Sequence, residues 1–144
     1  MVALELSRRT LDQANRLYPL VQTVPDLAEE DPEAIFTAVI QGLQDVVRAV
    51  GAITAISFSA AMHSVIVMDD HDQPLTQVLT WADNRGAQYA ARLRGSAQGA
   101  ALFARTGMPV HPMSPLVKLM WLNDTQPAVM AQAEQRRAQV VLET

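Results

Sequence analysis

The chain has 144 residues, 49% hydrophobic and 18% charged, with a formal net charge of −4, and these values predict one folded domain with a buried core. The absence of a basic block argues against nucleic acid or an anionic membrane as a partner, and the absence of cysteine excludes disulfides, thiolate metal sites and a cysteine nucleophile. No apolar run reaches the roughly 20 residues of a membrane span, and no apolar signal core follows Met1, so a cytoplasmic protein is expected.

The N-terminal third predicts short strands followed by one well-defined helix. Thr10–Val24 mixes β-branched and polar residues and predicts a strand that is irregular at Pro19. The acidic segment Pro25–Asp31 predicts a loop. Asp31-Pro32-Glu33 combines a capping acid, a proline at the first helical position and an acid near the positive end of the helix dipole, so it predicts a helix start. Apolar residues then recur at helical spacing as far as Gly51, which predicts the helix end.

Three β-prone segments follow in the next part of the chain. Ile53–Ser59 has too many apolar residues for a half-exposed strand and predicts a strand inside the sheet. Ser64–Met68 and Leu75–Trp81 predict a hairpin around the turn-forming residues 69–74. Polar and aromatic side chains stand at the ends of these segments, and α/β proteins usually hold ligands at strand ends.

The C-terminal part is predicted to be helical. Asn84–Arg94 and Gln98–Arg105 are rich in alanine and are separated near Gly95. Ser114-Pro115 predicts the start of another helix, and Pro127 the start of a last one that runs to about Arg137. The helix after Pro115 is expected to face inward with Leu116, Leu119, Met120 and Leu122, and with Lys118 as the odd polar member. The order of strands, helix, strands and helices predicts an α/β fold with a mixed sheet and flanking helices.

Two groups of side chains are candidates for a binding site. Met62 and His63 are candidates for substrate contact, in which the imidazole forms hydrogen bonds and the thioether packs against carbon atoms. The alternative is that His63 is a turn residue and Met62 a core residue beside it. Trp81, Asp83 and Arg85 either offer the apolar ring and polar groups that a polyol needs, or belong to a helix N-terminus. The residues alone leave both alternatives open for each group.

Metal and nucleotide sites are not indicated by the residues themselves. The three histidines lack metal-ligand spacing, and the acidic turn at residues 69–72 lacks the later glycine and glutamate of a calcium loop. No glycine-rich phosphate loop is present in the sequence. The histidines are His63, His71 and His111.

Four ordered segments together resemble motifs of the FGGY carbohydrate kinases. Tyr18-Pro19-Leu20 followed by Ala28–Glu33 is similar to that family's "YPL … AEQDPEE" passage. Ser59–Ser64 resembles its "SGQMHG" segment, and Leu79–Arg85 its "W-x-D-x-R" motif. Thr106–Leu122 is similar to its "TG-x-P-x-HPMSP-x-x-KL-x-WL" passage, and "WADNR" combined with "HPMSPLVKL" is closest to the gluconokinase branch.

This resemblance implies ATP-dependent phosphorylation of a hydroxyl group on a sugar or sugar acid, with gluconate as the expected substrate and xylulose, glycerol or another polyol as alternatives. It also implies a ribonuclease-H-like (actin-like ATPase) fold. In this interpretation His63, Asp83 and Arg85 hydrogen-bond the sugar acid, while Trp81 and Met62 shape the wall. The substrate-binding residues expected from the resemblance are Met62, His63, Trp81, Asp83, Arg85 and Met113, with His111 behind Met113.

The chain also departs from the family pattern. The family's "D-x-G-T-T" phosphate hairpin, its catalytic aspartate in a "G-x-x-D" segment and its second domain have no counterpart, so residues 1–144 are expected to form an incomplete N-terminal kinase domain. We therefore expect no catalytic residue and no kinase activity from the chain alone. ATP and Mg²⁺ serve the full-length family, and neither is expected to bind this chain.

Two other interpretations remain beside the kinase one. Lack of the first strand leaves an unpaired sheet edge, and such an edge favours self-association. The chain is then a non-catalytic sugar-binding or self-association module derived from a kinase. A third interpretation is an unrelated α/β domain.

Overall fold

The computed structural model describes residues 1–5, 7–135 and 140–142. The chain divides into two compact units, of which unit 1 comprises Met1–Pro19 and Glu30–Ser59, and unit 2 comprises Leu20–Glu29 and Ala60–Thr144. Among the described helices, none combines the length and the apolar character needed to cross a membrane.

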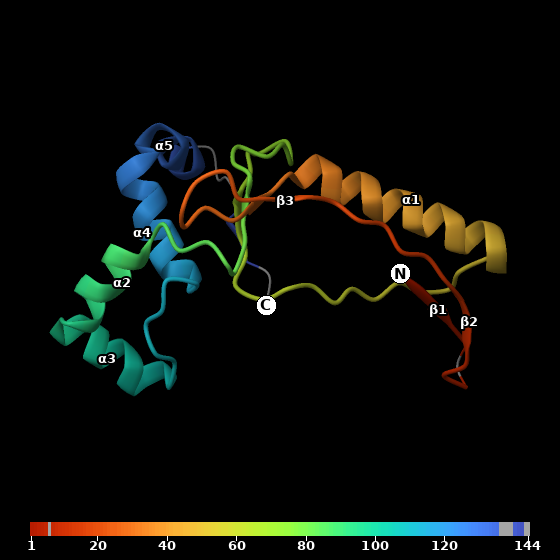
Figure 1. Cartoon of the computed structure of the whole chain (residues 1–144), viewed down its shortest axis with the longest axis horizontal. Coiled ribbons are helices and arrows are strands. Elements are labelled where there is room, and N and C mark those ends of the chain that lie inside the picture. Colours follow the sequence, from red (N-terminus) through yellow and green to blue (C-terminus); the bar gives the residue numbers. More distant parts are fainter. Residues whose placement is uncertain (6, 136–139, 143–144) are drawn as a thin grey trace. The chain divides into compact units, whose positions relative to one another are not determined.

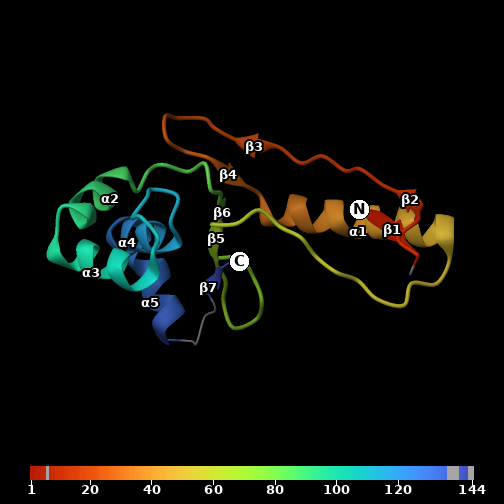
Figure 2. The same cartoon turned by 90° about the horizontal axis from the view of Figure 1, so that it is seen from below.

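Unit 1 consists of a β-hairpin, a long helix and an irregular segment. Strand β1 (Val2–Leu4) pairs antiparallel with β2 (Thr10–Gln13), with Ala3 opposite Asp12. Helix α1 (Pro32–Val50) packs alongside this hairpin (Figure 1, Figure 2).

The bounds of α1 agree with those predicted. The Asp31 carboxylate accepts a hydrogen bond from the backbone N–H of Glu33 at 2.9 Å, and Gly51 ends the helix with a φ of 81°. Both signals act within one turn of the chain, so they could be recognised without knowledge of the fold. The apolar face is only partly covered: Val46 is buried, whereas Phe36 stays 63% exposed.

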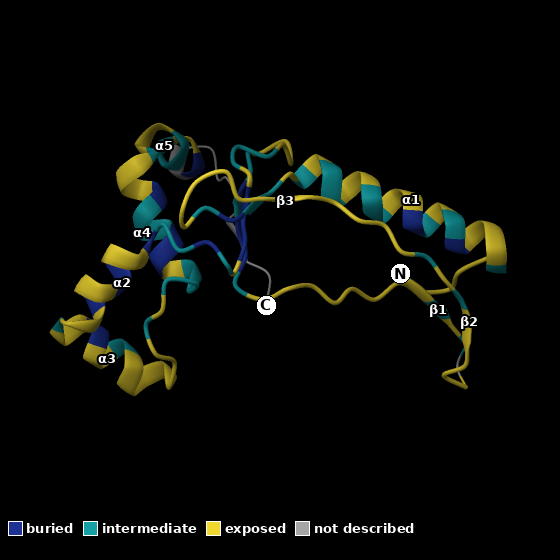
Figure 3. Ribbon diagram, viewed as in Figure 1, coloured by how far each residue is buried: buried dark blue, intermediate teal, exposed yellow. Residues whose placement is uncertain are grey.

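Residues Ile53–Ser59 do not form the predicted interior strand. The segment has neither helix nor strand, and each of its residues is exposed (Figure 3). A run of β-prone residues becomes a strand only when a neighbouring strand supplies hydrogen-bond partners for its backbone. In the described part of unit 1, β1 pairs with β2 instead.

Most of a five-stranded sheet lies in unit 2, in the strand order β3-β4-β6-β5-β7. The predicted hairpin is confirmed: β5 and β6 are antiparallel, Val65 lies opposite Leu79, and a bridge joins Met68 to Pro74 beside the turn. The strands are β3 (Leu20–Val21), β4 (Glu29–Glu30), β5 (Val65–Val67), β6 (Val78–Leu79) and β7 (Val140–Leu142).

Two strands of this sheet were not predicted. Strand β4 lies in the segment expected to be a loop. Next to it, the Ala28 carbonyl accepts hydrogen bonds from the Thr80 N–H at 3.1 Å and from the Thr80 hydroxyl at 2.9 Å. Strand β7 pairs antiparallel with β5, with Val67 opposite Val140. Both pairings join residues more than 50 positions apart, so the local pattern carries no signal for them.

Within the described residues, four helices follow β6, at the positions where helices were predicted. Ser114 stands at the N-cap of α4, but its hydroxyl accepts from the N–H of His111 at 3.3 Å rather than from the helix. Leu116 is 45% exposed instead of inward, while Val117 is fully buried. The helices are α2 (Ala87–Arg94), α3 (Ala97–Thr106), α4 (Pro115–Thr125) and α5 (Pro127–Gln135), and the predicted end of the last helix lies outside the described residues.

The core of unit 2 joins the sheet to the helices through α4. One apolar cluster packs Leu122 of α4 against the β5–β6 hairpin, and a second packs Val117 of α4 against Tyr89 and Ala90 of α2. Figure 3 shows buried residues, in dark blue, on the strands of the hairpin and on α2 and α4. The predicted α/β class with flanking helices is confirmed, and α4 connects the hairpin end to the helical layer.

Candidate functional site

The β5–β6 ladder brings two of the predicted site segments to the same end of the hairpin. Val65 lies opposite Leu79 in an antiparallel register. His63 precedes Val65 by two residues and Trp81 follows Leu79 by two, so both residues lie just beyond the same end of the antiparallel ladder. This is the placement that a shared binding surface requires.

The accessible members of the predicted set are Met62, His63, Trp81 and Met113. Met62 is 56% exposed and Trp81 is 57% exposed, and the other two are partly exposed. His63 has a φ of 70°, in the left-handed region that residues with a Cβ rarely adopt. A ligand at the hairpin end can therefore reach a thioether, an imidazole and an indole.

Asp83 is buried and its carboxylate is occupied by protein donors. It is 1% exposed and accepts hydrogen bonds from the backbone N–H of Ala28 at 3.0 Å and from the Nε of Arg85 at 2.9 Å. The backbone N–H of Arg85 also donates to it, at 3.2 Å. Asp83 therefore ties the loop after β6 to the residue before β4.

Arg85 is held by two carboxylates and an aromatic ring. Its guanidinium forms ion pairs with Glu29 and, at 2.8 Å, with Asp83, and it lies 4.2 Å from the centre of the Trp121 ring. Desolvation lowers the pKa of Arg85, but the hydrogen bonds to Asp83 and Glu29 outweigh it, so the net pKa is raised. The positive charge of Arg85 is thus compensated inside the protein, which leaves less of it for a substrate carboxylate.

Lys118 joins two of the predicted site residues. Its ammonium donates hydrogen bonds to the carbonyl oxygens of His63 at 2.9 Å and Met113 at 2.6 Å, and the residue is 1% exposed. Burial lowers the pKa of Lys118 to about 8, although the nearby Asp83 carboxylate raises it. One buried cation thereby bridges the segment before β5 and the turn before α4.

The structure therefore divides the six predicted residues into two groups. Four of them are accessible at the hairpin end or at the turn before α4: Met62, His63, Trp81 and Met113. The remaining two, Asp83 and Arg85, form a buried charged cluster with Glu29 and Lys118. Sequence reasoning missed the roles of Glu29, Lys118 and Trp121. The signal for Lys118 was its position among apolar residues that were expected to face inward. No local signal marked Glu29 as the partner of Arg85, because the two residues are 56 positions apart.

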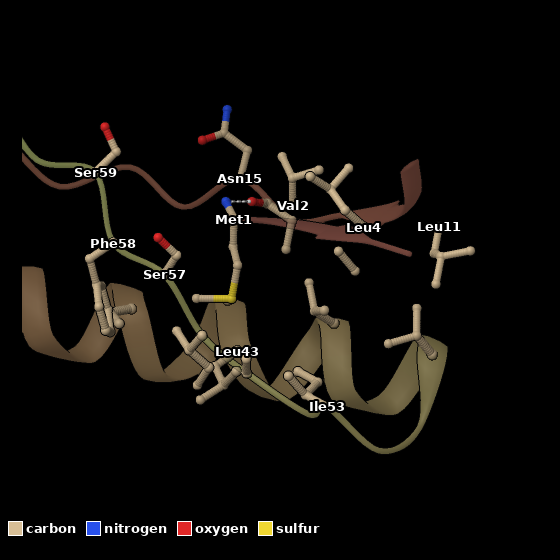
Figure 4. A pocket seen from close by; sticks show the side chains of 18 of the residues that line it. Met1, Val2, Leu4, Leu11, Asn15, Leu43, Ile53, Ser57, Phe58 and Ser59 are labelled. Atoms are coloured by element: carbon tan, nitrogen blue, oxygen red, sulfur yellow. Dashed lines mark hydrogen bonds between the residues drawn. The ribbon is translucent and has the colours of Figure 1, made fainter. Parts of the chain in front are cut away.

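A cavity of about 1070 Å³ lies in unit 1 and contains none of the predicted site residues. Its walls are β1, α1 and residues 52–59, and we call it the unit 1 groove (Figure 4). The side chains that line it are mainly apolar and include Val2, Leu4, Leu43, Ile53 and Phe58. Polar residues such as Glu5, Asn15 and Arg16 also line it, but every residue expected to contact the sugar belongs to unit 2, so the groove is not the candidate binding site.

Comparison with known proteins gives a single family. Residues 1–142 match the model for the N-terminal domain of the FGGY family of carbohydrate kinases. The gluconokinase of Bacillus subtilis (strain 168) is 40% identical over 119 residues, which are 81% of this chain and 23% of that protein. The chain thus spans about a quarter of the length of this relative.

Solved structures agree with the family match. The crystal structure of gluconate kinase from Lactobacillus acidophilus superposes with a TM-score of 0.86 at 36% identity, over 91% of this chain and 27% of that one. The ligand-bound xylulose kinase from Lactobacillus acidophilus gives the same values. The expected ribonuclease-H-like, actin-like fold class is thereby confirmed.

Proposed function

Because the chain belongs to the FGGY family of carbohydrate kinases, we propose that it is part of an ATP-dependent kinase that phosphorylates a hydroxyl group of a sugar acid, with gluconate as the substrate. Within that kinase the chain supplies one wall of the sugar site. The relative that is 40% identical is named a gluconokinase, and this supports gluconate rather than another polyol as the proposed substrate.

The observation that carries the proposal is the convergence of three distant segments. His63 and Trp81 lie just beyond the same end of the β5–β6 ladder, and one ammonium group, that of Lys118, binds the carbonyls of both His63 and Met113. A sugar acid needs hydrogen-bonding groups for its hydroxyls and an apolar surface for its carbons. The imidazole and the indole, each accessible, meet these two needs.

We assign direct contacts with the sugar to Met62, His63, Trp81 and Met113. Asp83 and Arg85 were expected from the sequence to hydrogen-bond the sugar acid. Their present contacts support a different role, in which the buried ion pairs hold the loop that carries Trp81.

We propose that this chain alone does not bind Mg²⁺–ATP. In the described ranges, no three His, Asp or Glu side chains come together in a way that could hold a metal ion, and the sequence contains no glycine-rich phosphate loop. We therefore derive no step of phosphoryl transfer from this chain and propose that it does not phosphorylate gluconate alone. ATP-dependent formation of phosphogluconate by the purified chain would contradict this.

Calorimetric titration with gluconate tests the sugar site. Binding is expected to be weak and measurable for the wild type, and lost in the Trp81→Ala variant because the apolar wall is removed. Phe103→Ala is the matched control, since Phe103 is a similarly exposed aromatic residue on α3 at 54%. Equal binding by both variants, or no binding by the wild type at millimolar gluconate, contradicts the proposal.

Self-association is a second candidate function, favoured by the unit 1 groove. Ile53–Ser59 has no strand partner in the described part of the chain and borders the groove together with β1. We propose that the occupant is the same segment of a second copy. The two Ile53–Ser59 segments would pair antiparallel around a two-fold axis. The segment of one copy would then enter the groove of the other copy, between that copy's β1 and its own Ile53–Ser59 segment. Because of the symmetry, both grooves are filled at once.

Light scattering at micromolar concentration tests this pairing. The wild type is expected to be a dimer, and Ile56→Lys a monomer, because a charge then enters the apolar interface. Phe36→Lys is the control, since Phe36 is exposed on α1 and does not line the groove. A monomeric wild type, or equal dissociation by both variants, contradicts the pairing.

A further inference from the structure

We infer that Lys118, the only lysine of the sequence, is a positioning residue of the sugar site that fixes the backbones of His63 and Met113 relative to one another. This inference rests on the proposed function, because it concerns the residues to which sugar contacts are assigned. Lys118 itself is 1% exposed, so it acts through its two carbonyl partners.

The backbone of His63 needs such support. Its φ of 70° is unfavourable for a residue with a Cβ, and such conformations persist only where the surrounding structure holds them. Lys118 binds the carbonyl of this same residue at 2.9 Å. The hydrogen bond therefore stabilises the turn from which the imidazole projects.

The turn before α4 is held by the same residue from two directions. The Lys118 ammonium binds the Met113 carbonyl at 2.6 Å, while the Lys118 backbone N–H donates to the Ser114 carbonyl at 3.2 Å. The Met113 N–H in turn donates to Nδ1 of His111 at 3.2 Å. Met113 is thus fixed on both sides, and Lys118 links its turn to His63, which lies 55 positions before the lysine.

The charge of Lys118 is balanced by a neighbour that does not compete for these carbonyls. Asp83 lies close enough to favour the ammonium form, and it is itself fixed by Ala28 and Arg85. A methionine at position 118 has a similar length and no donor, so it would leave both carbonyls without their partner. An arginine keeps the charge, but its N–H donors lie in one plane on several nitrogen atoms. This geometry does not match two carbonyl oxygens that both bind a single ammonium nitrogen.

Gluconate titration of three proteins is the first test. Lys118→Met is expected to bind about tenfold more weakly than the wild type, since hydrogen bonds to a charged group are lost from both loops. Leu116→Gln, an exposed position on the same helix, is expected to bind like the wild type. Equal affinities of wild type and Lys118→Met would overturn the inference.

NMR of the wild type is the second test and needs no variant to fold. Labelling with ¹⁵N-lysine gives one side-chain signal, and its titration midpoint is expected near pH 8. The ¹³C signals of the His63 and Met113 carbonyls are expected to shift with that same midpoint, because both hydrogen bonds weaken when the ammonium loses its charge. The charged group that faces the ammonium is Asp83, which is joined to Arg85 and through it to Glu29.

The two tests separate the inference from the proposed function. If the wild type binds no gluconate, the proposed function is contradicted, and the carbonyl titration still decides whether Lys118 fixes the two loops. Carbonyl signals that do not follow the lysine would overturn the inference, whatever the wild type binds.

Discussion

The carboxylate of Asp83 accepts a hydrogen bond from the backbone N–H of Ala28 at 3.0 Å, and these two residues are 55 positions apart in the chain. This contact joins the loop after β6 to the residue before β4. The same carboxylate binds Arg85 of its own loop, so one buried charge fixes this loop internally and connects it to a distant segment of unit 2.

Replacement of this charge is expected to destabilise unit 2. Asp83→Asn should lower the free energy of unfolding by about 3 kcal/mol, because Arg85 and Lys118 then lose a buried counter-charge. Urea denaturation followed by tryptophan fluorescence measures this effect, since both tryptophans belong to unit 2. Asp45→Asn is the control: Asp45 pairs with Arg16 and Arg48 in unit 1, so the tryptophan-detected transition should not move.

The pH dependence of stability should report Lys118. Its pKa is lowered to about 8 from an ordinary value of 10.5, so between these values the unfolded chain binds a proton that the folded chain lacks. Stability therefore rises with pH across this window. The difference in unfolding free energy between wild type and Lys118→Met is expected to stay constant from pH 6 to about 7 and to increase from about pH 8 upwards. A constant or falling difference above pH 8 contradicts the assignment.

Leu79 is a test of the apolar core behind the site. It is 1% exposed and packs with Val65, Val67 and Leu122. Leu79→Ala is expected to cost about 3 kcal/mol through lost burial and the cavity left behind. Leu116→Ala removes the same atoms from a position that is 45% exposed, and its cost should stay below about 1 kcal/mol. Similar losses in the two variants would place the core elsewhere.

Two glycines give opposite expectations for the same substitution. A Cβ at Gly99 would lie 2.0 Å from the carbonyl oxygen of Leu93, a backbone atom that cannot move aside cheaply, whereas a Cβ at Gly95 meets nothing closer than 3.7 Å. Gly99→Ala is therefore expected to cost about 2 kcal/mol. Gly95→Ala, at an ordinary φ of −77°, should change stability by no more than about 0.5 kcal/mol. Thermal unfolding of both variants checks the pair, and a neutral Gly99→Ala contradicts the close approach of α2 and α3.

The sequence by itself determined the elements whose signals are local. The start of α1 at Asp31, its end at Gly51 and the turn between β5 and β6 each depend on residues within a few positions, so capping and turn rules were sufficient. The motif resemblance also predicts that the segments carrying His63, Trp81 and Met113 belong to the sugar site, and this stays a prediction.

Only the tertiary structure decided what these elements contact. Ile53–Ser59 has the composition of an interior strand but acquires no strand partner in the described part of unit 1, because strand formation depends on a neighbour distant in sequence. Arg85 has the chemistry of a carboxylate ligand, yet Glu29 and Asp83 already bind it. In the sequence, Lys118 is only a polar residue among the apolar positions of a helix. The structure shows that its ammonium binds the carbonyls of His63 and Met113. Long-range pairing of charges and backbone groups is a property of packing, and local sequence carries no record of it.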